Sequence, residues 1–256
     1  MFIHGAWLHA LSWECWVERF TGHGYLAHAP GWPGEAATAR EAREHPDRVP
    51  DLGLDGLTDH FAGIVRSFEV PPVIIGHSVG GLVAQHLVGA GLGRAAVALA
   101  PAPVNDVAMR CPDCACASAR LAVPLTPERF RDLLGTTVRG AEGERLYDRY
   151  VVPAPRRLLA DLGCGGGPRH PSTSADTRNA ARGPLLLVSG QEDLLVPDCV
   201  TRAVYKAYGD STATTDLKQF PDRGHSLVID SGWRSVADYV LDWLAERGVR
   251  PTAPAR

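Results

Sequence analysis

A short apolar run ending in a glycine-rich turn constrains this chain more than any other segment. Residues 73–83 read VIIGHSVGGLV, a buried-strand pattern that leads into the turn Gly-His-Ser-Val-Gly at 76–80 and then into a helical pattern. The flanking glycines leave room for a sharp turn beside Ser78. At the start of a helix, backbone N–H groups favour an anion. The segment therefore predicts either an exposed nucleophilic serine or a plain turn in which Ser78 caps the helix.

Strand-like and helix-like segments alternate along most of the chain. Apolar runs predict strands at 25–29, 73–75, 95–100, 185–189 and 213–220. Helical spacing of apolar residues predicts helices at 13–21, 57–68, 82–89, 200–208 and 233–247. This alternation is typical of an α/β fold with a mostly parallel, doubly wound sheet covered on both faces. Residues 2–3 leave almost no strand before a His-Gly turn, so either the sheet is short at this edge or the natural start lies upstream.

The alternation stops between residues 101 and 182. This stretch is rich in helical and loop-like sequence and holds twelve Arg against nine Asp plus Glu. Loops beyond ~15 residues are usually functional lids or disordered, so we expect an inserted cap here. The chain 1–256 would then be one domain, with a core of 1–100 and 183–249. Apolar runs at 121–125 and 130–134 favour a substrate with an apolar acyl or alcohol group.

Composition excludes several classes of partner. The 256 residues carry a net charge of −3, which favours neither nucleic acid nor an anionic membrane surface. No apolar run reaches the ~18 residues of a membrane span, and we expect no signal peptide. Six cysteines permit disulfides, but a core of this size does not require them. A soluble cytoplasmic protein with mostly reduced thiols is the expectation.

Two segments near the C-terminus supply partners for Ser78. An unassisted serine hydroxyl needs a base, and the base needs an acid to orient it. The run LLLVSGQEDLLVP is an apolar strand whose end delivers Asp193 into a loop, and KQFPDRGHSLVID places His225 in a glycine turn after another strand. The order Ser78, Asp193, His225 is the one expected for a nucleophile on a strand-to-helix turn.

With these motifs the chain resembles the α/β-hydrolase fold superfamily, in its branch of serine esterases and cofactor-free haloperoxidases. The resemblance covers nearly the whole length and is weakest over the cap. It implies that the His-Gly-Ala-Trp turn at 4–7 positions an oxyanion hole made of the backbone N–H groups of Ala6 and Val79. Trp7 and His77 would border the substrate pocket. No cofactor and no metal are implied.

Other titratable residues compete with this set. Asp198 is better explained as the N-cap of a helix from residue 199 than as the catalytic acid. Glu192 adjoins Asp193 but would point elsewhere on a tight turn. His77 is expected as a packing or hydrogen-bonding neighbour of the serine turn, and His4 as a turn residue that bonds backbone. The remaining histidines have no acid or serine context.

A cysteine cluster raises a separate possibility. Residues 111–116 read CPDCAC, which could bind zinc or form a redox pair, but the second ligand pair of a zinc site is missing. Cys164 and His170 could contribute, although no motif orders them. Plain loop cysteines are the preferred interpretation, and an interaction module built on this cluster would instead predict stoichiometric zinc. The glycine run at 163–167 is expected to be a flexible cap loop.

Together these features predict a serine hydrolase that cleaves a carboxylic ester of a small molecule through an acyl-enzyme. Lactonase, thioesterase, carbon–carbon bond hydrolase and cofactor-free haloperoxidase are alternatives within the fold, and a non-catalytic ligand-binding protein is the alternative outside enzymes. Dehalogenases and epoxide hydrolases are disfavoured because such relatives carry Asp at the position of Ser78. Activity should fall below neutral pH, since His225 must be neutral to act as a base.

Overall fold

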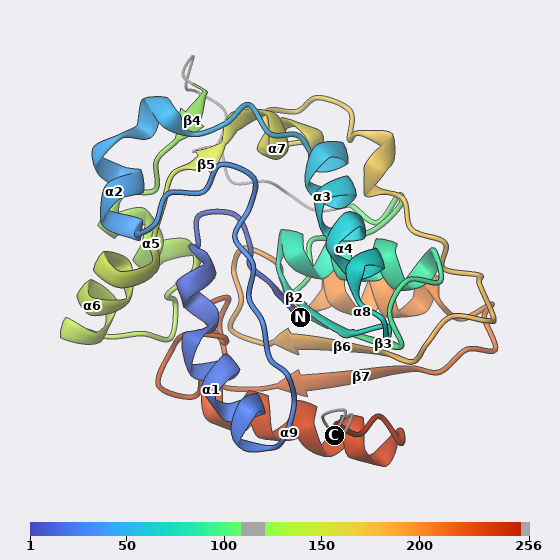
Figure 1. Cartoon of the computed structure of the whole chain (residues 1–256). Coiled ribbons are helices and arrows are strands. Elements are labelled where there is room, and N and C mark those ends of the chain that lie inside the picture. Colours follow the sequence, from blue (N-terminus) through green and yellow to red (C-terminus); the bar gives the residue numbers. More distant parts are fainter. Residues whose placement is uncertain (109–120, 252–256) are drawn as a thin grey trace.

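A five-stranded parallel sheet forms the centre of the molecule. The computed structural model describes residues 1–108 and 121–251 (Figure 1). The strand order is β1-β2-β3-β6-β7, and each neighbouring pair is parallel. The strands are β1 (Phe2–Ile3), β2 (Val73–His77), β3 (Ala95–Leu99), β6 (Leu185–Gly190) and β7 (Thr215–Phe220). The predicted α/β class with a parallel sheet is confirmed.

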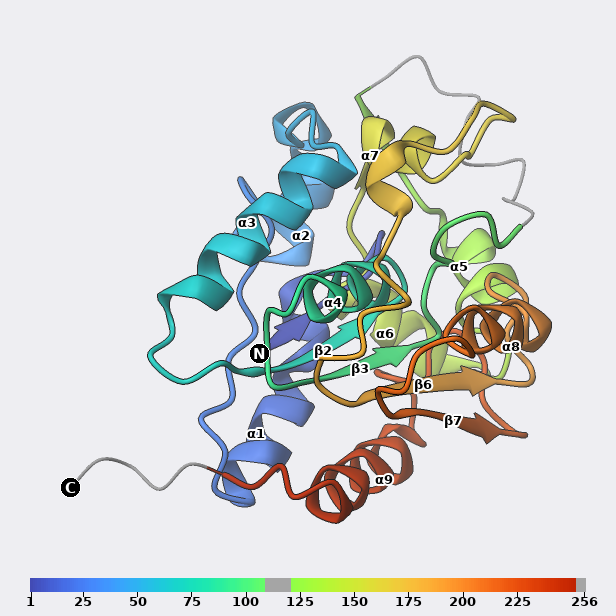
Figure 2. The ribbon, with the colours of Figure 1, turned by 90° about the vertical axis from the view of Figure 1, so that its right-hand side faces the viewer.

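Helices cover both faces of this sheet. Figure 2 shows α1 and α9 on one face and α3, α4 and α8 on the other. Their bounds are α1 (Glu14–Gly22), α3 (Leu54–Ser67), α4 (Val79–Gly89), α8 (Asp198–Ala207) and α9 (Trp233–Glu246). The three inner strands β2, β3 and β6 are buried throughout, which explains why they read as continuous apolar runs.

The strand predicted at 25–29 is wrong. This segment is irregular, although the Phe2 N–H donates to the His28 carbonyl at 2.8 Å. A single ladder bond does not make a strand, so β1 is the edge of the sheet within the described residues. With only two residues, β1 is as short as expected. The other strands and helices lie where predicted, with ends shifted by a few residues.

The cap segment, residues 101–182, contributes no strand to the five-stranded sheet in its described part, 101–108 and 121–182. In Figure 1 its elements lie to the left of and above the sheet. They are β4 (Ala122–Val123), β5 (Ala154–Pro155), α5 (Pro127–Leu133), α6 (Ala141–Tyr150), α7 (Arg156–Asp161) and the 3-10 turn η4 (Pro171–Thr173). β4 and β5 pair antiparallel with each other.

The segment between α1 and α3 packs against the cap segment. It contains α2 (Ala39–Glu44) and the 3-10 turn η2 (Pro46–Arg48), while the 3-10 turn η1 (Ala10–Trp13) precedes α1. Arg43 of α2 donates to the carbonyls of Val151 at 2.6 Å and Asp148 at 2.8 Å, near the C-terminus of α6. Free carbonyls at a helix end attract a cation, so this arginine ties the two segments together.

An aromatic cluster fills the space between α1 and the β1 edge. Phe2 stacks on Trp13 with ring centroids 5.0 Å apart and meets Phe20 edge-on at 5.2 Å. The indole N–H of Trp16 donates to the Val228 carbonyl at 2.9 Å. The core therefore reaches the loop that follows β7, which carries His225.

Among the helices of residues 1–108 and 121–251, none combines the length and the apolar character that crossing a bilayer requires.

Candidate active site

Ser78 occupies a strained turn between β2 and α4. Its backbone has φ 54° and ψ −117°, a conformation that costs a non-glycine residue about 1–3 kcal/mol. A Cβ on Gly76 would overlap the Gly80 carbonyl, and a Cβ on Gly80 would overlap the Ile3 carbonyl. The Ser78 N–H donates to the Leu99 carbonyl at 2.9 Å. The glycines therefore permit the close approach of β1, β2 and α4 that this turn needs.

Asp193 and His225 lie on the loops after β6 and β7. The His225 Nδ1–H donates to Asp193 Oδ2 at 2.7 Å, and both residues are at most 2% exposed. The other carboxylate oxygen, Oδ1, accepts the N–H groups of Leu195 at 2.9 Å and Val196 at 2.8 Å. These bonds hold the carboxylate in place, and the bond at Nδ1 leaves His225 Nε2 as the basic nitrogen.

The turn after β1 lies directly against Ser78. A Cβ on Gly5 would stand 2.7 Å from the Ser78 Cβ. The turn is closed by the Leu8 N–H donating to the Gly5 carbonyl at 3.3 Å, with Trp7 at φ 61°. The closing bond does not use the Ala6 N–H. Val79 is the first residue of α4, whose first N–H groups have no acceptor within the helix.

A family model decides the fold family. The alpha/beta hydrolase family model matches residues 1–239. The chain belongs to the α/β-hydrolase family. No curated protein matches its sequence.

Solved structures of other α/β-hydrolases resemble this one at low sequence identity. A methylesterase from Arabidopsis is 16% identical with a TM-score of 0.66, over 96% of this chain and 98% of that one. A monoacylglycerol lipase from Paleococcus ferrophilus is 17% identical with a TM-score of 0.70, over 96% and 93%. A pyrethroid hydrolase from Sphingobium faniae is 16% identical with a TM-score of 0.59, over 95% and 96%. At such identities the likeness establishes the fold alone.

Asp198 is not the N-cap of α8 in this α/β-hydrolase. The helix begins at Asp198 and its N-cap is Pro197, which offers no side-chain acceptor. Asp198 Oδ1 instead accepts the Ser189 hydroxyl at 2.6 Å and the Gln219 amide at 2.7 Å. The carboxylate thus joins the ends of β6 and β7, and such a distant partner leaves no local sequence signal. Glu192 is exposed, as expected for a residue pointing away from the acid.

His4 bonds backbone as predicted, with its Nδ1–H donating to the Gly5 carbonyl at 3.1 Å. Sequence reasoning missed its other partners. His4 Nε2 lies 3.2 Å from Glu35 Oε1, and the ring stacks on Trp32 with centroids 4.5 Å apart. Burial alone would raise the pKa of Glu35, but the charges of His4 and His9 and the hydrogen bonds from His4 and the Ala10 N–H outweigh it and lower the pKa.

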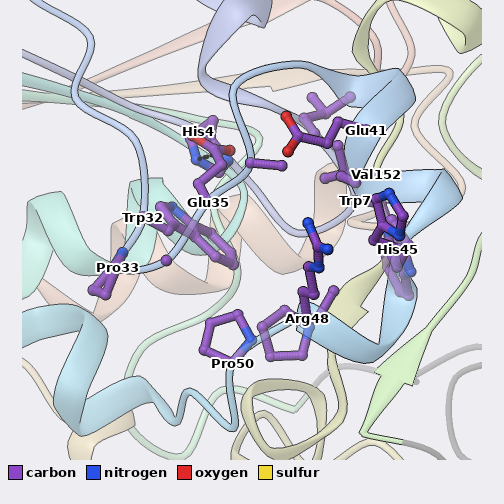
Figure 3. A pocket seen from close by; sticks show the side chains of 17 residues that line it. His4, Trp7, Trp32, Pro33, Glu35, Glu41, His45, Arg48, Pro50 and Val152 are labelled. Carbon is purple, nitrogen blue, oxygen red and sulfur yellow. Dashed lines mark ion pairs between the residues drawn. The ribbon is translucent and has the colours of Figure 1, made fainter.

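A cavity of about 220 Å³ is lined by His4 and Trp7 of the turn that follows β1 (Figure 3). Trp7 lines it, and its indole N–H donates to the Val123 carbonyl of the cap segment at 3.0 Å. Neither Ser78, Asp193 nor His225 lines it. The other lining residues labelled in Figure 3 are His4, Trp32, Pro33, Glu35, Glu41, His45, Arg48, Pro50 and Val152. This cavity is not the space at the serine, so the assignment of Trp7 to the substrate pocket stays a prediction.

His77, which was also assigned to the substrate pocket, does not line this cavity. It is 1% exposed, and its Nε2 lies 2.9 Å from the His225 carbonyl oxygen. The expected role as a hydrogen-bonding neighbour of the serine turn is therefore confirmed, and the pocket role stays a prediction.

The cap segment forms hydrogen bonds to the loop that carries the candidate acid Asp193 (the acid loop) and to the loop that carries the candidate base His225 (the base loop). The Thr136 hydroxyl donates to the Glu192 carbonyl at 2.7 Å, beside Asp193. The Ser226 N–H, next to His225, donates to the Leu134 carbonyl at 2.8 Å. Sequence patterns do not reveal such contacts, because the partners are 56 and 92 positions apart. The positions of both loops therefore depend on the cap segment.

The cysteine cluster at Cys111, Cys114 and Cys116 lies outside the described residues. Cys164 is disulfide-bonded, while Cys15 and Cys199 are free. In the part of the chain that the structure describes, no group of three His, Cys, Asp or Glu side chains is arranged to hold a metal ion.

Proposed function

We propose that this protein is a serine hydrolase that cleaves a carboxylic ester of a small molecule. The 2.7 Å hydrogen bond between Asp193 and His225, next to the strained turn of Ser78, is the observation that carries the proposal. A buried carboxylate that orients one imidazole nitrogen leaves the other to accept a proton. The names of the structural neighbours, a methylesterase, a monoacylglycerol lipase and a pyrethroid hydrolase, support an ester as the bond.

Acylation would begin with His225 Nε2 taking the proton of the Ser78 hydroxyl as the serine oxygen attacks the ester carbonyl carbon. The Ala6 and Val79 N–H groups would donate to the resulting oxyanion, and losing one such donor costs about 10²–10³ in rate. Asp193 would stabilise the imidazolium. The carbon–oxygen bond to the alcohol then breaks, and the alcohol leaves with the proton from His225.

Deacylation would repeat these steps with water. His225 removes a proton from a water molecule that attacks the acyl carbon, and the proton returns to Ser78 as the acid leaves. The cap segment would roof this space. Of its two apolar runs, 130–134 packs into the core, with Phe130 and Leu134 at most 1% exposed. Leu121 and Leu125 of the other run line a separate pocket. An apolar acyl or alcohol group remains the proposed preference.

Covalent labelling tests the proposal without knowledge of the substrate. A fluorophosphonate should label the folded protein once, at Ser78, and the Ser78→Ala variant should stay unlabelled. Folded wild type that does not label would refute the hydrolase and favour a non-catalytic member of the fold. For a protein that does label, turnover of matched p-nitrophenyl esters, thioesters and lactones identifies the bond.

A further inference from the structure

His77, the last residue of β2, joins the serine strand to the base loop. Its ring lies 4.6 Å from the ring of His225, centroid to centroid. A Cβ on Gly5 would stand 3.0 Å from His77 Nδ1, so the ring also borders the oxyanion turn. His77 therefore precedes Ser78 in the chain, and its buried side chain borders both the ring of His225 and the oxyanion turn.

The hydrogen bond of His77 defines its tautomer. A carbonyl oxygen only accepts, so the His77 Nε2 that lies 2.9 Å from the His225 carbonyl must carry the proton. Nδ1 is buried and has no hydrogen-bond partner among the described residues. Burial, and then the nearby His225, lower the pKa of His77 well below its usual value. The ring is thus a neutral donor with a single bond to make.

The peptide bond after His225 is held at both of its polar atoms. His77 binds its carbonyl oxygen at 2.9 Å, and the Leu134 carbonyl of the cap segment accepts its N–H, that of Ser226, at 2.8 Å. The side chain of His225 is held separately, by Asp193. Of these three contacts, only the one from His77 comes from β2, the strand that leads directly into Ser78.

We propose that His77 is a positioning residue, which sets the placement of His225 relative to Ser78 through this one hydrogen bond to the base's own carbonyl. The proposal deepens the proposed function and rests on it. Misplacing a reacting group by about 1 Å can cost ~10²-fold in rate. Because His77 would act on the geometry of proton transfer and touch no substrate, its loss should lower kcat and leave KM unchanged.

Two substitutions separate the hydrogen bond from the bulk of the ring. In His77→Gln the amide nitrogen reaches about as far as Nε2 and can still donate, whereas His77→Leu fills similar space without a donor. We expect His77→Leu to lower kcat and the fluorophosphonate labelling rate roughly 10–100-fold. His77→Gln should restore most of both rates.

A matched control removes the same kind of bond elsewhere. His86 Nδ1–H donates to the Ser174 carbonyl at 2.8 Å, on the far part of α4. His86→Leu should leave kcat within about twofold of wild type, and thermal unfolding of all three variants reports any loss of folded protein. Equal rates for His77→Leu and His77→Gln, or a wild-type rate for His77→Leu, would overturn the proposal.

A spectroscopic measurement keeps this test independent of activity. The proton shared by His225 Nδ1 and Asp193 should give a downfield ¹H resonance in Ser78→Ala, which cannot turn over. Adding His77→Leu should shift or broaden it, while adding His77→Gln should preserve it. If the resonance responds in this way but wild type labels with no fluorophosphonate, the proposed function fails and the positioning stands. An unchanged resonance in both double variants would refute the positioning.

Discussion

At the scale of the residue, the backbone around Ser78 is packed so closely that adding one methyl group should destabilise the fold. In Gly80→Ala the added methyl group would overlap the carbonyl of Ile3, a fully buried residue of β1. Overpacking of this kind costs about 1–3 kcal/mol. We expect a fall of that size in the free energy of unfolding in urea, together with loss of fluorophosphonate labelling.

The control for this substitution is Gly63→Ala, in the middle of α3. A Cβ there meets no atom within 4 Å. Alanine favours a helix over glycine by about 0.5–1 kcal/mol, so Gly63→Ala should be neutral or stabilising. If both variants had the same stability, close approach at the serine turn could not be the reason for Gly80.

Asp193 and Asp198 provide a second contrast between neighbouring residues. Asp193→Asn keeps the size of the side chain but loses the charge that orients His225, and the analogous change in a serine protease lowers kcat ~10⁴-fold. We expect a loss of that order in ester turnover. Asp198→Asn retains an oxygen that accepts from Ser189 and Gln219, so its kcat should stay within a few-fold of wild type. A larger loss in Asp198→Asn would reassign the acid.

Acid stability should report the buried contact of Glu35. Its pKa is lowered in the folded protein from the ordinary value of 4.5, so the folded state binds fewer protons than the unfolded chain. The stabilisation is therefore present above pH 4.5 and is lost as the pH falls through the folded pKa. Melting temperatures of wild type should drop more steeply than those of Glu35→Gln from pH 6 to 3. Glu44→Gln, which removes an exposed i,i+4 partner of Arg40, should follow wild type.

At the scale of the element, the cap segment is hydrogen-bonded to the loops that carry Asp193 and His225. Thr136→Val removes the hydroxyl bond to the Glu192 carbonyl and keeps the shape of the side chain. The loss should cost about 0.5–1.5 kcal/mol and lower the labelling rate several-fold, since the acid loop loses a support. Thr58→Val removes an equivalent hydroxyl–carbonyl bond within α3. It should cost similar stability and leave labelling unchanged, and a parallel loss of labelling would contradict a specific role of Thr136.

Periodicity predicted the helices well, because α3 and α9 each bury one face and expose the other. The starts of α3 and α4, at Leu54 and Val79, were predicted a few residues late because the apolar spacing is weak there. The strand predicted at 25–29 is absent for a different reason. Its composition favours a strand, but a strand also needs a partner along its length, and β1 offers only two residues.

At the scale of the whole molecule, the proposed site is nearly closed. Ser78 is 6% exposed and His225 1%, so a bulky reagent reaches them only when neighbouring segments move. A fluorophosphonate with a long alkyl chain should therefore label more slowly than a diisopropyl reagent. Thr136→Val, by loosening the cap segment, should narrow that ratio. Equal rates for both reagents in wild type would show an open site.

The sequence by itself determined the parallel α/β sheet, because alternating strand and helix patterns allow few other arrangements. It also determined the candidates Ser78, Asp193 and His225, since each follows a strand of the sheet in the expected order. Only the tertiary structure decided the contacts among distant segments: His77 on the His225 carbonyl, Asp198 between β6 and β7, and Glu35 beside His4. These bonds join groups that no local pattern relates, because their geometry is set by how the loops pack at the end of the sheet.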